Sequence, residues 1–176
     1  ETLEEGGNLD RKTEGLADNE ALARRVQDGR GLTRPELAVL LSSGKLVLQD
    51  AIEKSALASD ASLQALLLAS FPQPMQERFA AFIEGHRLAP QIVATKLANR
   101  IVNRLGIVHP FELAEEEGAE LAQVAAAFAL AVQLFDLDAL WARLETAPMS
   151  EEARLALFSK AAGAVRSHMA DLLRAG

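Results

Sequence analysis

The chain has 176 residues, of which 49% are hydrophobic and 24% are charged, and its formal net charge is −7 at pH 7. This acidic balance argues against a nucleic-acid partner and against docking on an anionic membrane, because both need a concentrated basic face. Cysteine is absent, which excludes disulfides, thiolate metal sites and a cysteine nucleophile, and fits a reducing cytosol. No apolar run approaches the roughly 20 residues of a membrane span. We therefore expect a cytoplasmic protein without nucleic acid or membrane as a partner.

Two regions differ in composition. Residues 1–18 are polar and rich in glycine, so we expect them to be loosely ordered. The acidic start without an initiating methionine indicates a piece of a longer protein. Residues 19–176 are rich in alanine and leucine, which favour helix. We expect one all-α domain, an irregular bundle of about seven to nine helices, in which only Val102 and residues 107–108 could form a short strand.

The first predicted helices are marked by clear local signals. A short helix is expected over residues 19–27, ended by a pair of glycines. In the following run GLTRPELAVLL, Thr33 can act as the N-cap and Glu36 can reach back to it, which makes a capping box. Pro35 falls in the first turn, where its missing N–H costs nothing. This predicts a helix from Thr33 to about Ser55. Its apolar arc, which needs burial, consists of Leu37, Leu40, Leu41, Val47, Leu48 and Ile52.

The remaining chain predicts further helices separated by glycine, proline and capping residues. Gly106 and Gly118 are placed to end two of them. Asp136 or Asp138 could cap the penultimate helix, and Ser150 the last. The other expected ranges are 61–70, 75–85 (with Phe79, Phe82 and Ile83), 88–105, 110–117 and 120–135.

No motif marks a catalytic or cofactor site. Gly29-Arg-Gly31 is a lone GxG without a preceding strand, so it is not a dinucleotide fingerprint, and a P-loop is absent. His86, His109 and His168 lie far apart and lack the spacing of metal ligands. His109 is interpreted as a loop residue at a helix start, and residues 115–117, which are all Glu, as a solvated helix surface. We therefore assign no catalytic, cofactor-binding or metal-binding residue to this chain.

Two helices carry unusual residues on their polar sides. Val39 and Leu46 lie seven residues apart, so the first long helix is expected to be buried on two sides or to face a missing domain. Asn99, Asn103 and Arg104 belong to the polar residues of the 88–105 helix, in which asparagine is a poor helix former. A solvated face is one interpretation of these residues, and contact with another domain is the other.

The last helix contains a seam with heptad-like spacing. Packing inside the bundle would explain it, and self-association or docking to absent sequence is the alternative. The seam consists of Leu155, Phe158, Ala162, Val165, Met169 and Leu172.

The run Arg30–Leu41, followed by Lys45-Leu-Val-Leu48, resembles the C-terminal region of the large bacterial NAD-specific glutamate dehydrogenases. The resemblance continues in register over about residues 9–147 and loosely over the last helix. The chain departs from the family at Ser43, where an aromatic residue is frequent, and at Glu117, where the family has threonine. Further matching blocks are FP at 71–72, ERF at 77–79, HRL at 86–88, IVAT at 92–95, LAN at 97–99, VNR at 102–104, LAE at 113–115, GA at 118–119 and FDLDALW at 135–141.

This resemblance implies a long parent chain that deaminates L-glutamate oxidatively to 2-oxoglutarate with NAD. It implies that the glutamate site, the catalytic lysine and aspartate and the dinucleotide fold lie upstream, and that the parent is a homo-oligomer. No cofactor is then expected in this fragment. Our leading hypothesis is a non-catalytic C-terminal domain with a structural, assembly or regulatory role, packed against the upstream catalytic domains. The alternative is an independent helical interaction module that uses the 155–172 seam.

Overall fold

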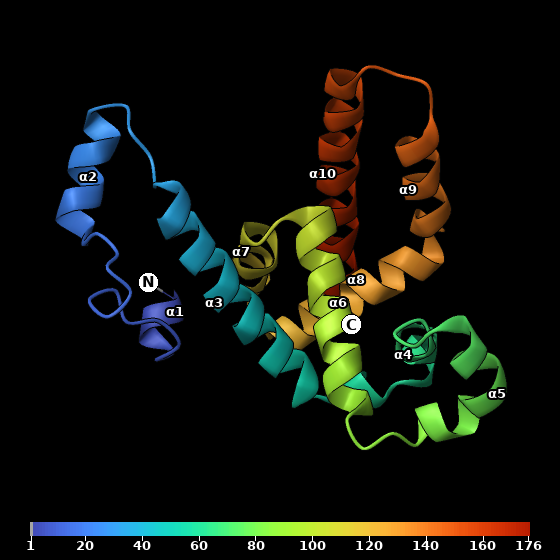
Figure 1. Cartoon of the computed structure of the whole chain (residues 1–176). Coiled ribbons are helices and arrows are strands. Elements are labelled where there is room, and N and C mark those ends of the chain that lie inside the picture. The colour runs from blue at the N-terminus through green and yellow to red at the C-terminus, as the bar shows by residue number, and fades with distance from the viewer. Residues whose placement is uncertain (1) are drawn as a thin grey trace. The chain divides into compact units, whose positions relative to one another are not determined.

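The structure, a computed structural model, describes residues 2–176, and its regular elements are all helical (Figure 1). Two 3₁₀ helices, 56–59 and 61–63, accompany the α-helices, and no strand occurs within residues 2–176. The all-α prediction is confirmed. The strand considered at Val102 and residues 107–108 is wrong, because Val102 lies inside one helix and Val108 begins another. The α-helices are α1 (Thr2–Glu5), α2 (Asn19–Gln27), α3 (Arg34–Glu53), α4 (Gln64–Leu68), α5 (Gln73–Glu84), α6 (Ala89–Leu105), α7 (Val108–Glu117), α8 (Leu121–Leu134), α9 (Leu137–Thr146) and α10 (Glu151–Ala175).

The chain divides into two compact units, residues 1–47 and 48–176. Helix α3 begins in the first unit and ends in the second. The looser order expected for residues 1–18 and the single domain expected from 19 to 176 both stay predictions.

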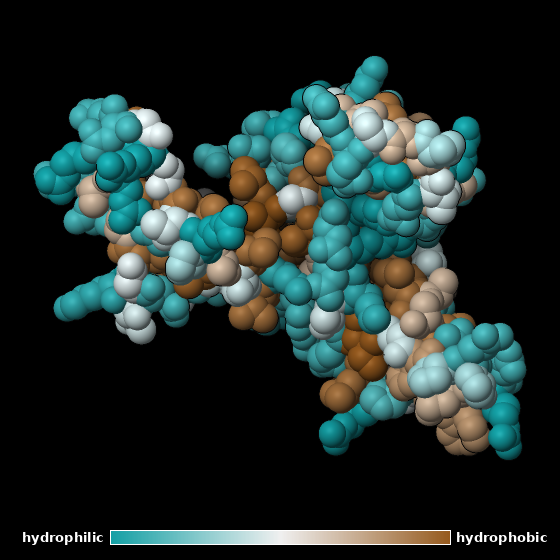
Figure 2. Space-filling view, turned by 45° about the horizontal axis from the view of Figure 1, so that its top comes forward, coloured by the Kyte–Doolittle hydropathy of each residue, from teal (hydrophilic) through white to brown (hydrophobic). Residues whose placement is uncertain are grey.

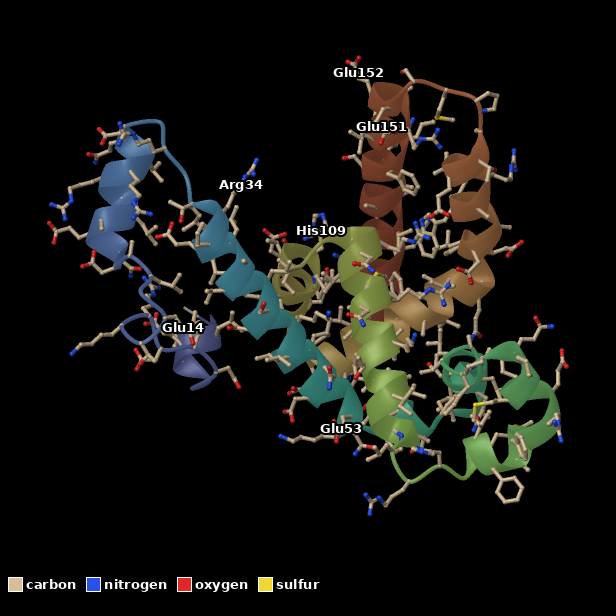
Figure 3. The ribbon with its side chains drawn as sticks, in the orientation of Figure 1. Glu14, Arg34, Glu53, His109, Glu151 and Glu152 are labelled. Carbon is tan, nitrogen blue, oxygen red and sulfur yellow. The ribbon has the colours of Figure 1, made fainter. Side chains whose placement is uncertain are left out.

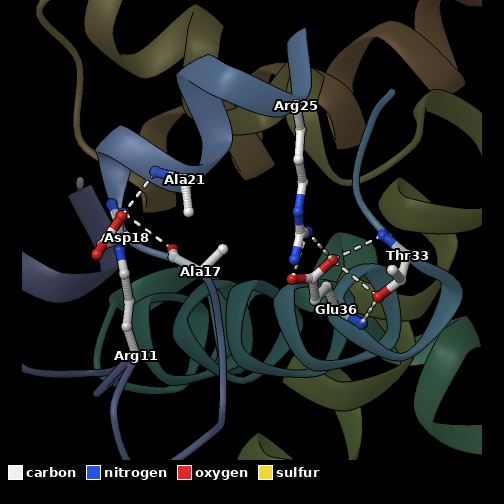
Figure 4. Close-up of polar contacts among 7 residues, drawn as sticks. All are labelled: Arg11, Ala17, Asp18, Ala21, Arg25, Thr33 and Glu36. Carbon is white, nitrogen blue, oxygen red and sulfur yellow. Dashed lines mark hydrogen bonds and ion pairs between the residues drawn. The ribbon is translucent and has the colours of Figure 1, made fainter. Parts of the chain in front are cut away.

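Polar contacts organise the first unit. The Arg11 guanidinium lies 2.7 Å from the Glu4 carboxylate and donates to the Asn19 side chain at 2.5 Å. Asp18 caps α2 by accepting from the Ala21 backbone N–H at 2.7 Å (Figure 4). Among the side chains described in residues 3–47, no hydrophobic one is fully buried, so this unit has no apolar core of its own.

The second unit contains the hydrophobic core, with α6 and α8 as its most buried helices. Helix α10 packs along α8 and also contacts α6, α7 and α9, while α4 packs on α5 and α6. Alanines at buried positions of α6 and α8 let the helices approach closely, and Phe128 fills the space between them and α9. Within the described residues no single helix is long and apolar enough to cross a membrane; α8 and α9 meet that test only as a pair, across a bend of 73°.

Most helix ends agree with the local signals. Helix α2 covers the predicted range 19–27, and α6 ends at Gly106, whose positive φ of 85° favours glycine. Ser150 caps α10 by accepting from the Ala153 backbone N–H at 3.2 Å. Asp136 is the N-cap residue of α9, but its side chain makes no capping bond and its φ is +46°. The predicted 61–70 helix begins as a 3₁₀ turn and becomes α-helical only at Gln64.

Helix α5 departs from the expected pattern of burial. Ile83 is buried, whereas Phe79 is exposed and the Phe82 side chain is 78% exposed. Phe79 has φ −131° and ψ 24°, which bends the helix there. Because the bend changes the direction of the helix, residues before and after it do not share one inward face. Figure 2 shows tan and brown surface at its lower right, over the region of α5.

Candidate functional site

The Thr33–Glu36 pair makes the reciprocal contacts of a capping box (Figure 4). The Thr33 backbone N–H donates to Glu36 Oε2 at 2.7 Å, and the Glu36 backbone N–H donates to Thr33 Oγ1 at 3.4 Å. The Thr33 hydroxyl also donates to Glu36 Oε2, at 2.7 Å. Sequence reasoning missed the third member: Arg25, near the end of α2, donates to both Glu36 oxygens at 2.8 Å. This cluster ties α2 to the first turn of α3.

Glu36 is a buried carboxylate whose charge is stabilised from several directions. The Thr33 backbone N–H, the Arg25 guanidinium and the Thr33 hydroxyl lower the pKa of Glu36 from 4.5 to about 2. At neutral pH the group is therefore ionised and paired. Its donors are all supplied from within the same unit, so the cluster serves to position helices and has no free proton to transfer.

Helix α3 is not buried on two sides in its N-terminal half, and contact of Val39 and Leu46 with a missing domain stays a prediction. Val39 is half-buried and Leu46 is 64% exposed. Leu37 and Leu41, which belong to the arc that needs burial, are also exposed. Only the C-terminal part of that arc is buried completely: Leu48 and Ile52.

Arg104 is engaged inside the second unit, and its contact with another domain stays a prediction. Its guanidinium lies 4.7 Å from the centre of the Trp141 ring and 2.8 Å from the Glu145 carboxylate on α9. Arg100, one turn earlier, pairs with Asp138 at the start of α9 and also lies over Trp141. These two arginines therefore hold α6 to α9 through ion pairs and cation–π contacts.

The asparagines of α6 keep the surface position that their spacing predicts. Asn99 is half-buried and Asn103 is exposed, and within the described residues neither side chain has a hydrogen-bond partner. Contact of these two residues with another domain stays a prediction.

The seam of α10 packs mainly inside its own unit. Val165 and Met169 are buried, and Phe158, Ala162 and Leu172 pack against the core while partly exposed. Leu155 is exposed. The self-association role proposed for Val165 and Met169 is corrected, because side chains that fill the core of their own chain cannot reach a second one.

Several predicted contact residues meet at one shallow cleft between the end of α6 and α10. It has a volume of about 490 Å³ and brings Asn103 and Arg104 together with Leu155 and Phe158. His109 also lines it, with Nδ1 at 3.5 Å from Glu112 but without a hydrogen bond. Figure 3 shows His109 at the start of α7, and Glu151 and Glu152 at the start of α10. Because α7 already begins at Val108, the interpretation of His109 as a loop residue is wrong. Across the described part of the chain, no three metal-ligating side chains gather at one place.

Two glutamates of α7 are engaged more fully than expected. Glu116 pairs with Arg166 at 2.6 Å, and Glu117 accepts from Arg174 Nε at 2.8 Å. Both partners lie on α10. The Glu116 side chain is still 54% exposed, which agrees with a solvated surface, whereas Glu117 is covered at 10% exposure and that interpretation is wrong for it. No local signal predicts these pairs, because they join positions at least 50 residues apart in the sequence.

Comparison with known proteins places the chain in a family. The family model described as "Glutamate dehydrogenase, C-terminal" matches residues 29–176. Three relatives, each named NAD-specific glutamate dehydrogenase, are 36% identical over 81% of the chain (Halomonas elongata), 38% over 81% (Pseudomonas aeruginosa) and 32% over 85% (Mycobacterium tuberculosis). In each case the match spans only 9% of the relative's own length. The chain therefore belongs to the glutamate dehydrogenase C-terminal family.

Proposed function

We propose that this chain is a non-catalytic C-terminal helical domain of an NAD-dependent glutamate dehydrogenase, with a structural or assembly role in the parent enzyme. The observation that carries the proposal is the family match over residues 29–176, combined with the small share of the relatives' length that it represents. The parent would deaminate L-glutamate oxidatively to 2-oxoglutarate with NAD. The catalytic domains that precede this one in the parent, and further copies of the parent, are its proposed partners.

The use of charged side chains supports a structural role. Arg25 joins α2 to α3, Arg100 and Arg104 join α6 to α9, and Arg166 and Arg174 join α7 to α10. Each of these cations is satisfied by a carboxylate of the chain itself. Such pairs determine the orientation of helices, whereas acid–base catalysis needs a group that can exchange its proton with a substrate.

The experiment compares the isolated chain with the full-length parent enzyme. The isolated chain should show no glutamate-dependent reduction of NAD, and neither NAD nor glutamate should shift its melting temperature. Binding restricted to the native state would raise that temperature, and the rise would grow with the logarithm of the ligand concentration once it exceeds the Kd. A clear rise with either ligand would refute the passive role. In the parent enzyme, deletion of this domain should change the state of assembly, which sedimentation measures. The turnover of each active site that still assembles correctly should change less.

A further inference from the structure

Helix α3 carries one apolar stripe that is only half used. Leu37, Leu41, Leu48 and Ile52 follow one another at intervals of four, seven and four residues, which places them on one side of the helix. Leu48 and Ile52 are completely buried, whereas Leu37 is 50% and Leu41 is 42% exposed. The same stripe thus begins in solvent and ends in a hydrophobic core.

The exposed half belongs to the unit that has no apolar core. The only fully buried charged side chain described there is that of Glu36, and polar clusters of this kind position elements without driving folding. Burial of apolar surface is what offsets the conformational entropy of an ordered chain. The contacts of Glu36 fix the first turn of α3, but the leucine stripe directly after that turn is uncovered. This part of α3 therefore lacks a covering surface.

Two basic side chains border the stripe and have no acidic partner. Arg34 and Lys45 lie on the Leu37–Leu41 side of α3, and within the described residues neither forms an ion pair or a hydrogen bond. Figure 3 shows Arg34 projecting from the first turn of the helix. In a chain with net charge −7, two unpaired cations beside an apolar stripe point to a covering surface that is apolar and has carboxylates at its edge.

We propose that the Leu37–Leu41 stripe docks on the preceding part of the full-length parent chain, an inference that rests on the proposed function. The matching family is the C-terminal one and the match spans 9% of each relative, so the parent offers a large surface elsewhere in the same chain. Covalent linkage gives that surface a high effective concentration. A second copy is a poorer occupant, because symmetric antiparallel pairing of two stripes would bring Arg34 of one copy near Lys45 of the other.

The test measures how fast a thiol reagent reaches single cysteines on the two sides of α3. Because this chain has no cysteine of its own, Leu41→Cys provides the probe on the stripe and Leu46→Cys the matched probe on the opposite side. Each variant is made in the isolated chain and in the full-length enzyme, and labelling at that one position is quantified by peptide mass spectrometry. Leu37→Cys is a second stripe probe for the case in which the first variant is misfolded, as judged by Trp141 fluorescence.

Labelling at position 41 should be on the order of tenfold slower in the full-length enzyme than in the isolated chain, because a docked cysteine reacts with the reagent only when the docked region opens locally. This difference should be the same at any protein concentration. Labelling at position 46 should change much less. Equal rates at position 41 in the two proteins would overturn the inference. Protection that appears in the isolated chain and grows with concentration would also overturn it, and would assign the stripe to a second copy. Neither outcome depends on the binding of NAD or glutamate. The docking inference can therefore fail separately from the proposed function, which ligand binding tests.

Discussion

Replacement of Phe128 by alanine should destabilise the second unit far more than the same change at Phe82. Phe128 is completely buried on α8 and stacks on Trp141 of α9, with a distance of 6.2 Å between ring centres and an interplanar angle of 19°. Arg104 also contacts the Trp141 ring. Deletion of the Phe128 ring therefore leaves a cavity and removes the support of the only tryptophan.

The magnitude follows from burial. A fully buried Phe→Ala change costs about 3–5 kcal/mol through lost transfer free energy and a residual cavity. The loss of a stacked aromatic neighbour places Phe128 near the middle of that range, at about 4 kcal/mol. Phe82 is 78% exposed, so the same truncation there should cost less than about 0.5 kcal/mol. With a urea m-value of about 2 kcal/mol/M, the expected midpoint shifts are about 2 M for Phe128→Ala and less than about 0.3 M for Phe82→Ala.

Urea unfolding followed by Trp141 fluorescence provides the assay, since the chain has one tryptophan and no tyrosine, and Trp141 is buried. Circular dichroism supplies a second probe that does not depend on the environment of the indole ring. Phe128→Leu, which retains part of the volume and should cost about 1.5 kcal/mol, serves if the alanine variant does not fold. Midpoints of Phe128→Ala and Phe82→Ala that agree within error would refute this assignment of the core.

Three further changes probe the polar contacts. Thr33→Val removes both hydroxyl contacts with Glu36 at similar volume and should destabilise the start of α3 by about 1 kcal/mol, seen as faster hydrogen exchange in its first turn. The pKa of Glu36 is lowered in the folded state, so its stabilising contribution should be complete above pH 4.5 and be lost as the pH falls through about 2; an NMR titration of this carboxyl with a midpoint near 4.5 would contradict that. Arg104→Met keeps the aliphatic stem but removes the cation over Trp141 and should cost about 1 kcal/mol, with a shift in Trp141 emission; unchanged emission and midpoint would contradict the cation–π contact.

Local signals predicted helix boundaries well because the atoms that decide them are close in sequence. Thr33 and Glu36 satisfy each other's backbone groups within one turn, and Gly106 has the positive φ that a helix end favours. The capping box of Glu120 and Gln123 at the start of α8 has the same three-residue spacing, but Glu at the N-cap is a weaker signal than Ser or Thr. Arg25 has no such local signal, since it reaches Glu36 only after the chain has turned between α2 and α3.

Periodicity predicts that a face is apolar, but it contains no information about what covers that face. The α10 seam has a spacing that suits a bundle and an oligomer equally, and only the burial of Val165 and Met169 decides for the bundle. The same ambiguity affects α6, where the spacing that placed Arg104 on a polar face could not reveal Trp141 beneath it. Contacts between distant segments therefore determine what covers an apolar face of a helix, whereas the spacing in the sequence shows only that such a face exists.

Helix α3 shows the same limit of periodicity at an exposed apolar stripe. Val39 and Leu46 look misplaced in the sequence because they are apolar residues on a polar side of the helix. Leu37 and Leu41 extend the stripe of Leu48 and Ile52, so the sequence predicts that they are buried. The structure leaves Leu37 and Leu41 exposed and places unpaired cations beside them. A stripe that follows the ordinary period of a core helix, yet lacks a core at one end, is a stronger indicator of a missing partner than an isolated apolar residue. The isolated residue costs little when exposed, whereas two leucines in series lose their burial energy together.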